Sequence, residues 1–328
     1  MTSGRQGPTS EEVLKSPDAL PPAGRHFHLE YQEQDADVTA VGATLRSYRV
    51  AGRDLLDGYP DTSRSTDGRG QLLLPWPNRI DGGRYQFEGV DYELPLTEPG
   101  KANAIHGLAR WLTWVQESVD KEKVRLSLVI YPQPGYDFTL GLSAEYRLGP
   151  AGLSVTVAAS NLGDRALPYG SGAHPYFTLG TTLVDELWMQ MDAATRLPNN
   201  DRGIPTGEAV PVKGTEYDFQ QPRQLGPQQL DTAFTDLGLD ADGQVTVELS
   251  LHDASESLRV WADPQHRYLM VFTGDSLPDS SVRRRGLGLE PMTCPPNAFR
   301  SGQGLITLAP GASRVTRWGV ELRRRTRP

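Results

Sequence analysis

Apolar and polar residues alternate in several stretches of the chain. Residues 124–130, 153–157, 245–251 and 318–322 each place an apolar side chain at every second position. A period of two is typical of a β-strand that buries one face and exposes the other. These stretches therefore predict strands whose apolar faces share a hydrophobic core.

Turn-forming residues separate these runs, at positions 82–83, 99–100, 242–243 and 310–311. The chain contains 34 Gly and 26 Pro, a content that favours many turns between short strands. No long run has the period of a helix, and strands and helices do not alternate along the chain. We therefore predict an all-β fold, a large antiparallel β-sandwich, with residues 25–328 in a single domain.

The first 24 residues differ from the rest of the chain. They are rich in Ser, Pro, Gly and charged residues, with too few apolar side chains to offset the entropy of ordering. We therefore expect residues 1–24 to form a disordered N-terminal arm.

Composition narrows the class of protein. The 33 basic and 41 acidic residues give a net charge of −8, which argues against a nucleic-acid partner. No apolar run approaches the roughly 20 residues that span a bilayer, and the start has no secretory signal. The single cysteine, Cys294, excludes an intramolecular disulfide. We expect a cytoplasmic protein, monomeric or dimeric, without a membrane partner.

Four segments combine polar residues with Gly, Pro and aromatic residues: 74–80, 103–107, 170–177 and 286–293. The chain lacks the phosphate-binding GxxxxGK[ST] and the zinc-binding HExxH patterns, so no metal site is predicted. Arg79 in the first segment suits sugar hydroxyls or carboxylates, or it binds backbone carbonyls at a turn.

The other three segments each contain one titratable candidate. His106 precedes a glycine, as a loop histidine with a structural hydrogen bond often does. His174 precedes a proline that disfavours helix, which would hold its imidazole rigidly for proton transfer. Glu290 ends an apolar run, as a general base or as part of a salt bridge. Each residue on its own leaves the functional and the structural interpretation open.

Taken together and in order, these segments resemble the aldose 1-epimerase (galactose mutarotase) family. The shared motifs are NRI-x-x-G-x-Y-x-F-x-G from Asn78, N-x-x-HG from Asn103 and G-x-G-x-HPYF from Gly170, then LD-x-x-F around Asp231 and the glutamate at Glu290. They extend over about two thirds of the chain, and the specificity lies in their order.

The resemblance implies a galactose-mutarotase-like supersandwich that interconverts the α and β anomers of a free glucose- or galactose-like hexose without a cofactor. By motif, it assigns His174 as the general acid and Glu290 as the general base. It assigns Asn78, Arg79 and His106 as sugar contacts. Asp231 is the implied acceptor of a hydrogen bond from a sugar hydroxyl.

One departure leaves the preferred hexose open, because Met270 stands where the family has a glutamine. Two alternative functions also follow. A mutarotase acting on a hexose 6-phosphate would need a cationic site, which Arg110 or the run 283–285 would supply. A non-catalytic carbohydrate-binding or sensor protein would keep the pocket without turnover.

Overall fold

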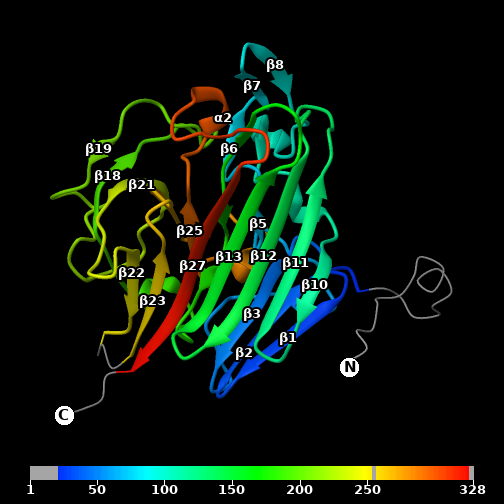
Figure 1. The fold of residues 1–328 in the computed structure, drawn as a ribbon. Coiled ribbons are helices and arrows are strands. Elements are labelled where there is room, and N and C mark those ends of the chain that lie inside the picture. Colours follow the sequence, from blue (N-terminus) through cyan, green and yellow to red (C-terminus); the bar gives the residue numbers. More distant parts are fainter. Residues whose placement is uncertain (1–20, 253–255, 325–328) are drawn as a thin grey trace, which may run out of the picture.

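Antiparallel strands form nearly all of the regular structure in residues 21–252 and 256–324, the part of the chain that the computed structural model describes (Figure 1). The helical elements there are single turns: η1 (Pro99–Lys101), η2 (Ala109–Trp111), η3 (Val184–Glu186), η4 (Ser280–Val282) and α2 (Ala298–Ser301). The predictions of an all-β fold and of antiparallel sheets are confirmed.

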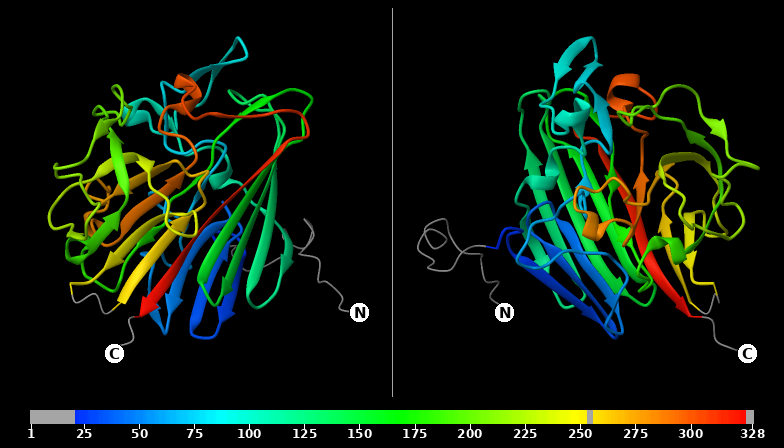
Figure 2. Two further views of the ribbon diagram at one scale, coloured as in Figure 1. Left: turned by 60° about the vertical axis from the view of Figure 1, so that its left-hand side comes forward. Right: turned by 180° about the vertical axis from the view of Figure 1, so that it is seen from behind.

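The largest sheet has nine strands and contains all four of the predicted ones. In spatial order it consists of β10 (Val115–Val119), β11 (Lys123–Ile130), β12 (Leu140–Gly149), β13 (Gly152–Asn161), β27 (Ser313–Arg324), β23 (Glu256–Ala262), β22 (Val245–Ser250), β17 (Trp188–Met191) and β20 (Arg223–Gln224). Buried and partly exposed residues alternate strictly along β13, as its sequence pattern predicts. Figure 2 shows β27 crossing the middle of this sheet.

A second sheet has eight strands. Its order is β19 (Val210–Pro211), β18 (Ala193–Leu197), β21 (Asp231–Leu237), β24 (Tyr268–Phe272), β25 (Leu287–Met292), β15 (Gly172–Ala173) and β5 (Leu72–Leu73), with β16 (Tyr176–Phe177) also paired to β25. Every residue of β25 is buried, so this strand lies in the interior.

The N-terminal strands form a separate four-stranded sheet, β1 (His26–Tyr31), β2 (Gln34–Thr39), β3 (Thr44–Val50) and β4 (Arg53–Asp54). Three short ribbons complete the fold: β6 (Arg79–Asp81) with β9 (Asn103–Ile105), β7 (Arg84–Phe87) with β8 (Val90–Glu93), and β14 (Leu167–Tyr169) with β26 (Ile306–Leu308). Strands β1 and β2 pack against β12, and one core cluster joins Leu29 and Val38 to Val155 and Trp318.

The predicted N-terminal arm lies largely outside the described residues, which begin at residue 21. Within residues 21–24, Ala23 is buried and its carbonyl accepts a hydrogen bond from the Val41 N–H (3.1 Å). The arm and the single domain over residues 25–328 stay predictions. Among the described helices, none has the length and apolar character needed to cross a membrane.

Candidate active site

One cavity of about 370 Å³ contains all six of the site residues predicted from the sequence. Its volume lies in the range of small-molecule sites. Its walls are polar and aromatic, and they comprise Asp67, Gly68, Asn78, Arg79, Thr97, Glu98, Lys101, Ile105, His106, Arg110, His174, Tyr176, Asp231, Phe272, Ser276, Leu277, Pro278 and Glu290. The segments singled out in the sequence thus meet at one place.

Three neighbouring strands of the eight-stranded sheet form the floor of this cavity. Asp231 begins β21 and pairs with Phe272 of β24, and Glu290 of β25 pairs with Met270 of β24. Residues directly opposite on paired strands point to the same face of a sheet. Met270 therefore lies beside Glu290, and its thioether gives the carboxylate no strong hydrogen-bond donor.

His174 follows β15 and is fixed by its own backbone and by a neighbouring ring. Its N–H donates to the Gln71 carbonyl (3.0 Å), and its carbonyl accepts from the Gly70 N–H (2.9 Å). The imidazole stacks on Tyr176, with ring centroids 4.9 Å apart and an interplanar angle of 19°. The Tyr176 hydroxyl donates to the Asp67 carbonyl (2.9 Å), so the stacking partner is itself held in place.

His174 and Glu290 form a buried pair. The His174 Nε2 lies 3.3 Å from the Glu290 Oε1, and the two side chains are 6 % and 2 % exposed. Neither the His174 Nδ1 nor the Glu290 Oε2 has a hydrogen-bond partner among the described residues. Buried polar atoms without a partner are uncommon in native structures and are consistent with a functional role.

Burial opposes charge on both members of this pair. It raises the pKa of Glu290 well above its usual value, and the Asp231 carboxylate adds to this effect while Arg79 opposes it. Burial, together with the smaller effect of the charges of nearby arginines, lowers the pKa of His174 to about 3. Burial therefore favours the neutral form of both side chains.

Arg79 lies at the start of β6 and is held by the carboxylate of Glu98, which directly precedes η1. Its Nε donates to the Glu98 Oε2 (2.8 Å), and its Nη2 donates to the Glu98 Oε1 (3.0 Å). The Asn103 Nδ2 donates to the same Oε2 (3.1 Å). At Gly203, a Cβ would lie 2.5 Å from the Arg79 Nη1, so glycine lets that loop close over the guanidinium. This two-point ion pair fixes the plane of the guanidinium.

Asn78 and His106 stand at the ends of the small ribbon of β6 and β9. Both have left-handed backbones, with φ of 53° and 63°, and the His106 N–H donates to the Asn78 carbonyl (2.9 Å). For a non-glycine residue such a conformation is uncommon and tends to occur at functional sites. Burial lowers the pKa of His106 well below its usual value, so it lines the cavity as a neutral imidazole.

Several lining residues lie outside the family motifs. Glu98 and Lys101 sit in the turn around η1, and Phe272 ends β24. Their contribution depends on pairing between distant segments, for which the sequence gives no local signal. Gly68 also lies outside the motifs. It nevertheless lies directly against the site, because a Cβ at this residue would be 2.7 Å from the His174 Cδ2.

Other sequence expectations can now be assessed. Arg110 lines the cavity, as the phosphate hypothesis requires. The 283–285 run does not line it: Arg284 is bound by the Asp185 and Asp275 carboxylates (2.9 and 2.6 Å), and Arg285 by Asp57. Within this cavity, the cationic site that the phosphate hypothesis requires can therefore come from Arg110 and not from the run 283–285.

Residues 21–252 and 256–324 contain no candidate metal site. No group of three or more His, Cys, Asp or Glu side chains there is arranged to hold an ion. Cys294 is buried outside the cavity lining, and burial raises the pKa of its thiol to about 12.

Comparison with known proteins adds independent information. The family profile described as aldose 1-epimerase matches residues 26–319. The protein YihR of Escherichia coli K12 is 32% identical over 290 residues, covering 88% of this chain and 90% of that protein. Galactose mutarotase of Homo sapiens is 25% identical over 214 residues, 61% of each chain. The solved galactose 1-epimerase of Lactobacillus acidophilus shares the fold, with a TM-score of 0.76 at 23% identity over 90% of this chain and 93% of that one. This chain therefore belongs to the aldose 1-epimerase family and is an isomerase of the mutarotase type.

Proposed function

We propose that the protein interconverts the α and β anomers of a free hexose by acid–base ring opening, with His174 and Glu290 as the catalytic residues. The observation that supports this proposal best is their 3.3 Å contact on the floor of a polar cavity. Mutarotation needs one group to remove a proton and another to supply one, and this pair offers both at a single place.

The proposed reaction moves two protons and breaks one bond. The Glu290 carboxylate takes the proton of the anomeric O1–H, and C1 and O1 become a carbonyl. The C1–O5 bond breaks, and O5 takes a proton from the His174 imidazolium. Rotation about C1–C2 presents the other face of the aldehyde, and the reverse steps close the ring. Each proton transfer contributes about 10²- to 10⁴-fold to the rate.

The reaction needs Glu290 as a carboxylate and His174 as an imidazolium, and a single proton transfer within the pair produces both. Transfer from the Glu290 Oε1 to the His174 Nε2 converts the neutral pair into carboxylate and imidazolium. The Arg79 guanidinium favours the carboxylate, because its charge opposes the burial effect on the pKa of Glu290. The hydroxyl groups of a bound sugar would supply further polar partners, which also favours the charged form.

The remaining predicted residues are suited to hold the sugar. Arg79 and Asn78 can donate hydrogen bonds, and the neutral His106 can donate or accept with its unpartnered Nδ1. The Asp231 carboxylate can accept from a hydroxyl. Tyr176 and Phe272 present aromatic surface to C–H groups of the ring.

Polarimetry of freshly dissolved α-D-glucose and α-D-galactose tests the proposal. We expect the protein to accelerate the change in rotation, and Glu290→Gln to reduce kcat by about 10²-fold or more. Glu93→Gln is the matched control, because Glu93 forms an exposed ion pair with Arg84 away from the cavity. A rate that Glu290→Gln leaves unchanged contradicts the assignment. Sugar binding without any acceleration would favour the non-catalytic binding protein.

Two cations favour a hexose 6-phosphate as a second candidate substrate. Lys101 and Arg110 line the cavity, and neither forms an ion pair with a carboxylate in the described part of the chain. Burial lowers the pKa of Arg110 to about 10, which indicates a cation whose charge is poorly compensated. A phosphate would compensate it. Glucose 6-phosphate turned over with a KM that rises steeply with salt, unlike that of glucose, would support this candidate.

A further inference from the structure

Residues 67–71 lie beside the proposed acid, and each of them contacts His174 or Tyr176, the ring that stacks on it. Four of these contacts use backbone atoms or the space that a missing side chain leaves, at Asp67, Gly68, Gly70 and Gln71. The fifth uses a long side chain, because the Arg69 guanidinium lies over the Tyr176 ring, 4.8 Å from its centroid. No step of the proposed reaction uses this arginine.

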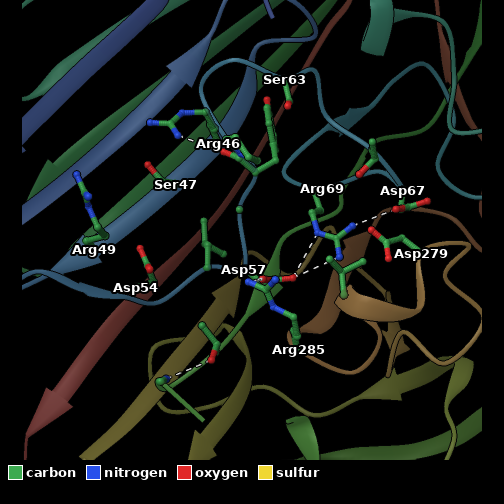
Figure 3. A pocket seen from close by; sticks show the side chains of 18 of the residues that line it. Arg46, Ser47, Arg49, Asp54, Asp57, Ser63, Asp67, Arg69, Asp279 and Arg285 are labelled. Atoms are coloured by element: carbon green, nitrogen blue, oxygen red, sulfur yellow. Dashed lines mark hydrogen bonds and ion pairs between the residues drawn. The ribbon is translucent and has the colours of Figure 1, made fainter. Parts of the chain in front are cut away.

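Arg69 has no direct contact with the space that the sugar would occupy. It is not part of the lining of the catalytic cavity, and its side chain is only 4 % exposed. It lies instead in the wall of the neighbouring groove that Figure 3 shows. Any effect of Arg69 on the reaction must therefore pass through another residue. Tyr176 provides that route, because its ring contacts both the guanidinium and the imidazole of His174.

Two carboxylates fix the guanidinium of Arg69 (Figure 3). Its Nη2 lies 3.3 Å from the Asp57 Oδ2, and its Nη1 lies 3.1 Å from the Asp67 Oδ2. The Asp57 N–H also donates to the Tyr176 carbonyl (2.8 Å). One aspartate thus holds both the arginine and the backbone of the ring that the arginine covers. A planar guanidinium with partners on two sides has a narrowly defined orientation, unlike the ammonium of a lysine.

The imidazole of His174 depends on packing for its orientation. In many histidines that transfer protons, a hydrogen bond to the second ring nitrogen fixes the ring. The His174 Nδ1 has no such partner in residues 21–252 and 256–324. Its ring is held by the Tyr176 stack, by the Glu290 contact and by an edge-on contact with His106, with centroids 5.2 Å apart. Catalytic groups need to be held within about 0.5 Å of their productive geometry.

We propose that Arg69 is a positioning residue for His174: it holds the Tyr176 ring against the imidazole and so fixes the direction in which the acid presents its Nε2 proton. This inference rests on the proposed function, because the orientation of the imidazole matters for turnover only if His174 transfers a proton. The alternative role of Arg69 is to neutralise the buried Asp57 carboxylate and to contribute to stability alone.

Two variants separate these roles by their stability. Arg69→Gln removes the guanidinium and leaves Asp57 with Arg285, at 2.9 Å, as its remaining cation. Arg69→Gln combined with Asp57→Asn removes the carboxylate as well, so no buried charge loses its partner. In urea unfolding, Arg69→Gln should be less stable than the wild type, and the double variant should regain much of that stability.

The kinetics of the same variants decide between the roles. If Arg69 positions the acid, both variants should lose roughly 10- to 100-fold in kcat with KM within about twofold, because a shift of about 1 Å in a reacting group is costly. If Arg69 only neutralises Asp57, kcat should recover together with stability in the double variant. Polarimetric initial rates at several sugar concentrations give both constants. Should Arg69→Gln fail to fold, the double variant carries this test alone.

Arg285→Gln is the matched control. Arg285 binds the other oxygen of Asp57, and its side chain is 52 % exposed. Its replacement leaves Arg69 with both of its carboxylates. We expect kcat to stay within about twofold of the wild type, since exposed ion pairs contribute little.

NMR of histidine-labelled protein follows the imidazole without any turnover. The stacked Tyr176 ring shifts the signals of the His174 ring protons, and the peak that is missing in His174→Asn identifies them among the six histidines. Both Arg69 variants should move these signals further than Arg285→Gln does.

The outcomes distinguish this proposal from the proposed function. A kcat that Arg69→Gln leaves unchanged, or that recovers in the double variant, overturns the positioning role. A rise in KM alone also overturns it, because it would mean that Arg69 affects sugar binding. If the wild-type protein does not accelerate mutarotation, the proposed function fails and the NMR signals decide the positioning by themselves. Displaced His174 signals in both Arg69 variants then support it, and unmoved signals overturn it.

Discussion

A glycine that touches the proposed acid offers a sharp test of how closely His174 must be positioned. Gly68 has φ of +80°, and a Cβ built on it lies 2.7 Å from the His174 Cδ2 and 3.1 Å from the Nε2. Ordinary contacts begin at 3.4 Å, so Gly68→Ala must displace the ring by roughly 0.7 Å. Tyr176 blocks retreat on one face of the ring, because the two rings are stacked.

This displacement should be visible mainly in kcat. A shift of about 1 Å in a reacting group can lower the rate about 10²-fold, so we expect Gly68→Ala to lose roughly 30- to 100-fold in kcat. The left-handed backbone adds a stability cost of about 1–2 kcal/mol for alanine. Polarimetric initial rates at several sugar concentrations separate kcat from KM, and urea unfolding measures the stability.

Gly89→Ala is the matched control. Gly89 also has φ of +80°, but no heavy atom lies within 4 Å of a Cβ built there. It should show the backbone part of the stability cost, without the added cost of displacing a buried ring, and normal kinetics. The reasoning is refuted if the two variants have the same kcat. A rise in KM alone would instead mean that the added methyl group excludes the sugar from the cavity.

The remaining predictions concern charge and burial. Folding raises the pKa of Glu290, so the folded protein retains a proton that the unfolded chain releases above about pH 4.5. The stability contributed by this group therefore falls as the pH rises from the unfolded pKa to the folded pKa. Glu290→Gln should abolish that fall in urea titrations at several pH values. The effect of His174 on stability has the opposite pH dependence, because its pKa is about 3 when folded and 6.5 when unfolded. Stability is therefore lost as the pH falls through this window. His174→Asn should flatten this dependence and lower kcat about 10²-fold or more. Glu98→Gln should raise KM and lower kcat in steady-state kinetics, because the Arg79 guanidinium loses the carboxylate that fixes its plane. Cys294→Ser should leave activity within about twofold, and native Cys294 should react with a thiol reagent only on unfolding, because the thiolate is scarce when the pKa is about 12.

Strands with one exposed face were predictable from the sequence, and strands with none were not. The alternation in residues 153–157 predicted part of β13, which the structure extends to Gly152–Asn161. Strands β15 and β16, which flank His174, have two residues each and are fully buried, so no alternation marks them. Their pairing with β25 depends on residues more than a hundred positions away.

The residues of the candidate site were likewise predictable only in part. Local motifs sufficed to select His174 and Glu290, because each combines an unusual polar residue with Gly and Pro neighbours. Their 3.3 Å contact needs the register of β15 and β25. Glu98 escaped detection, since its turn sequence looks like a solvated loop and only the Arg79 side chain gives its carboxylate a role. Trp76, in the first of the four segments, packs against Phe299 in the interior and does not line the cavity.

The position of β27 has a consequence for how the chain reaches its native state. This strand lies between β13 and β23, although β14 to β26 separate it from β13 in chain order. During synthesis, β10 to β13 and β22 to β23 emerge with open edges facing each other, and the gap between them closes only after Arg324 leaves the ribosome. Unpaired sheet edges recruit other chains, and non-local pairing is slow. Nascent chains stalled before β27 should therefore be aggregation-prone and depend on chaperones. In the finished chain, β27 pairs with β13 and β23 and covers the open edge of each.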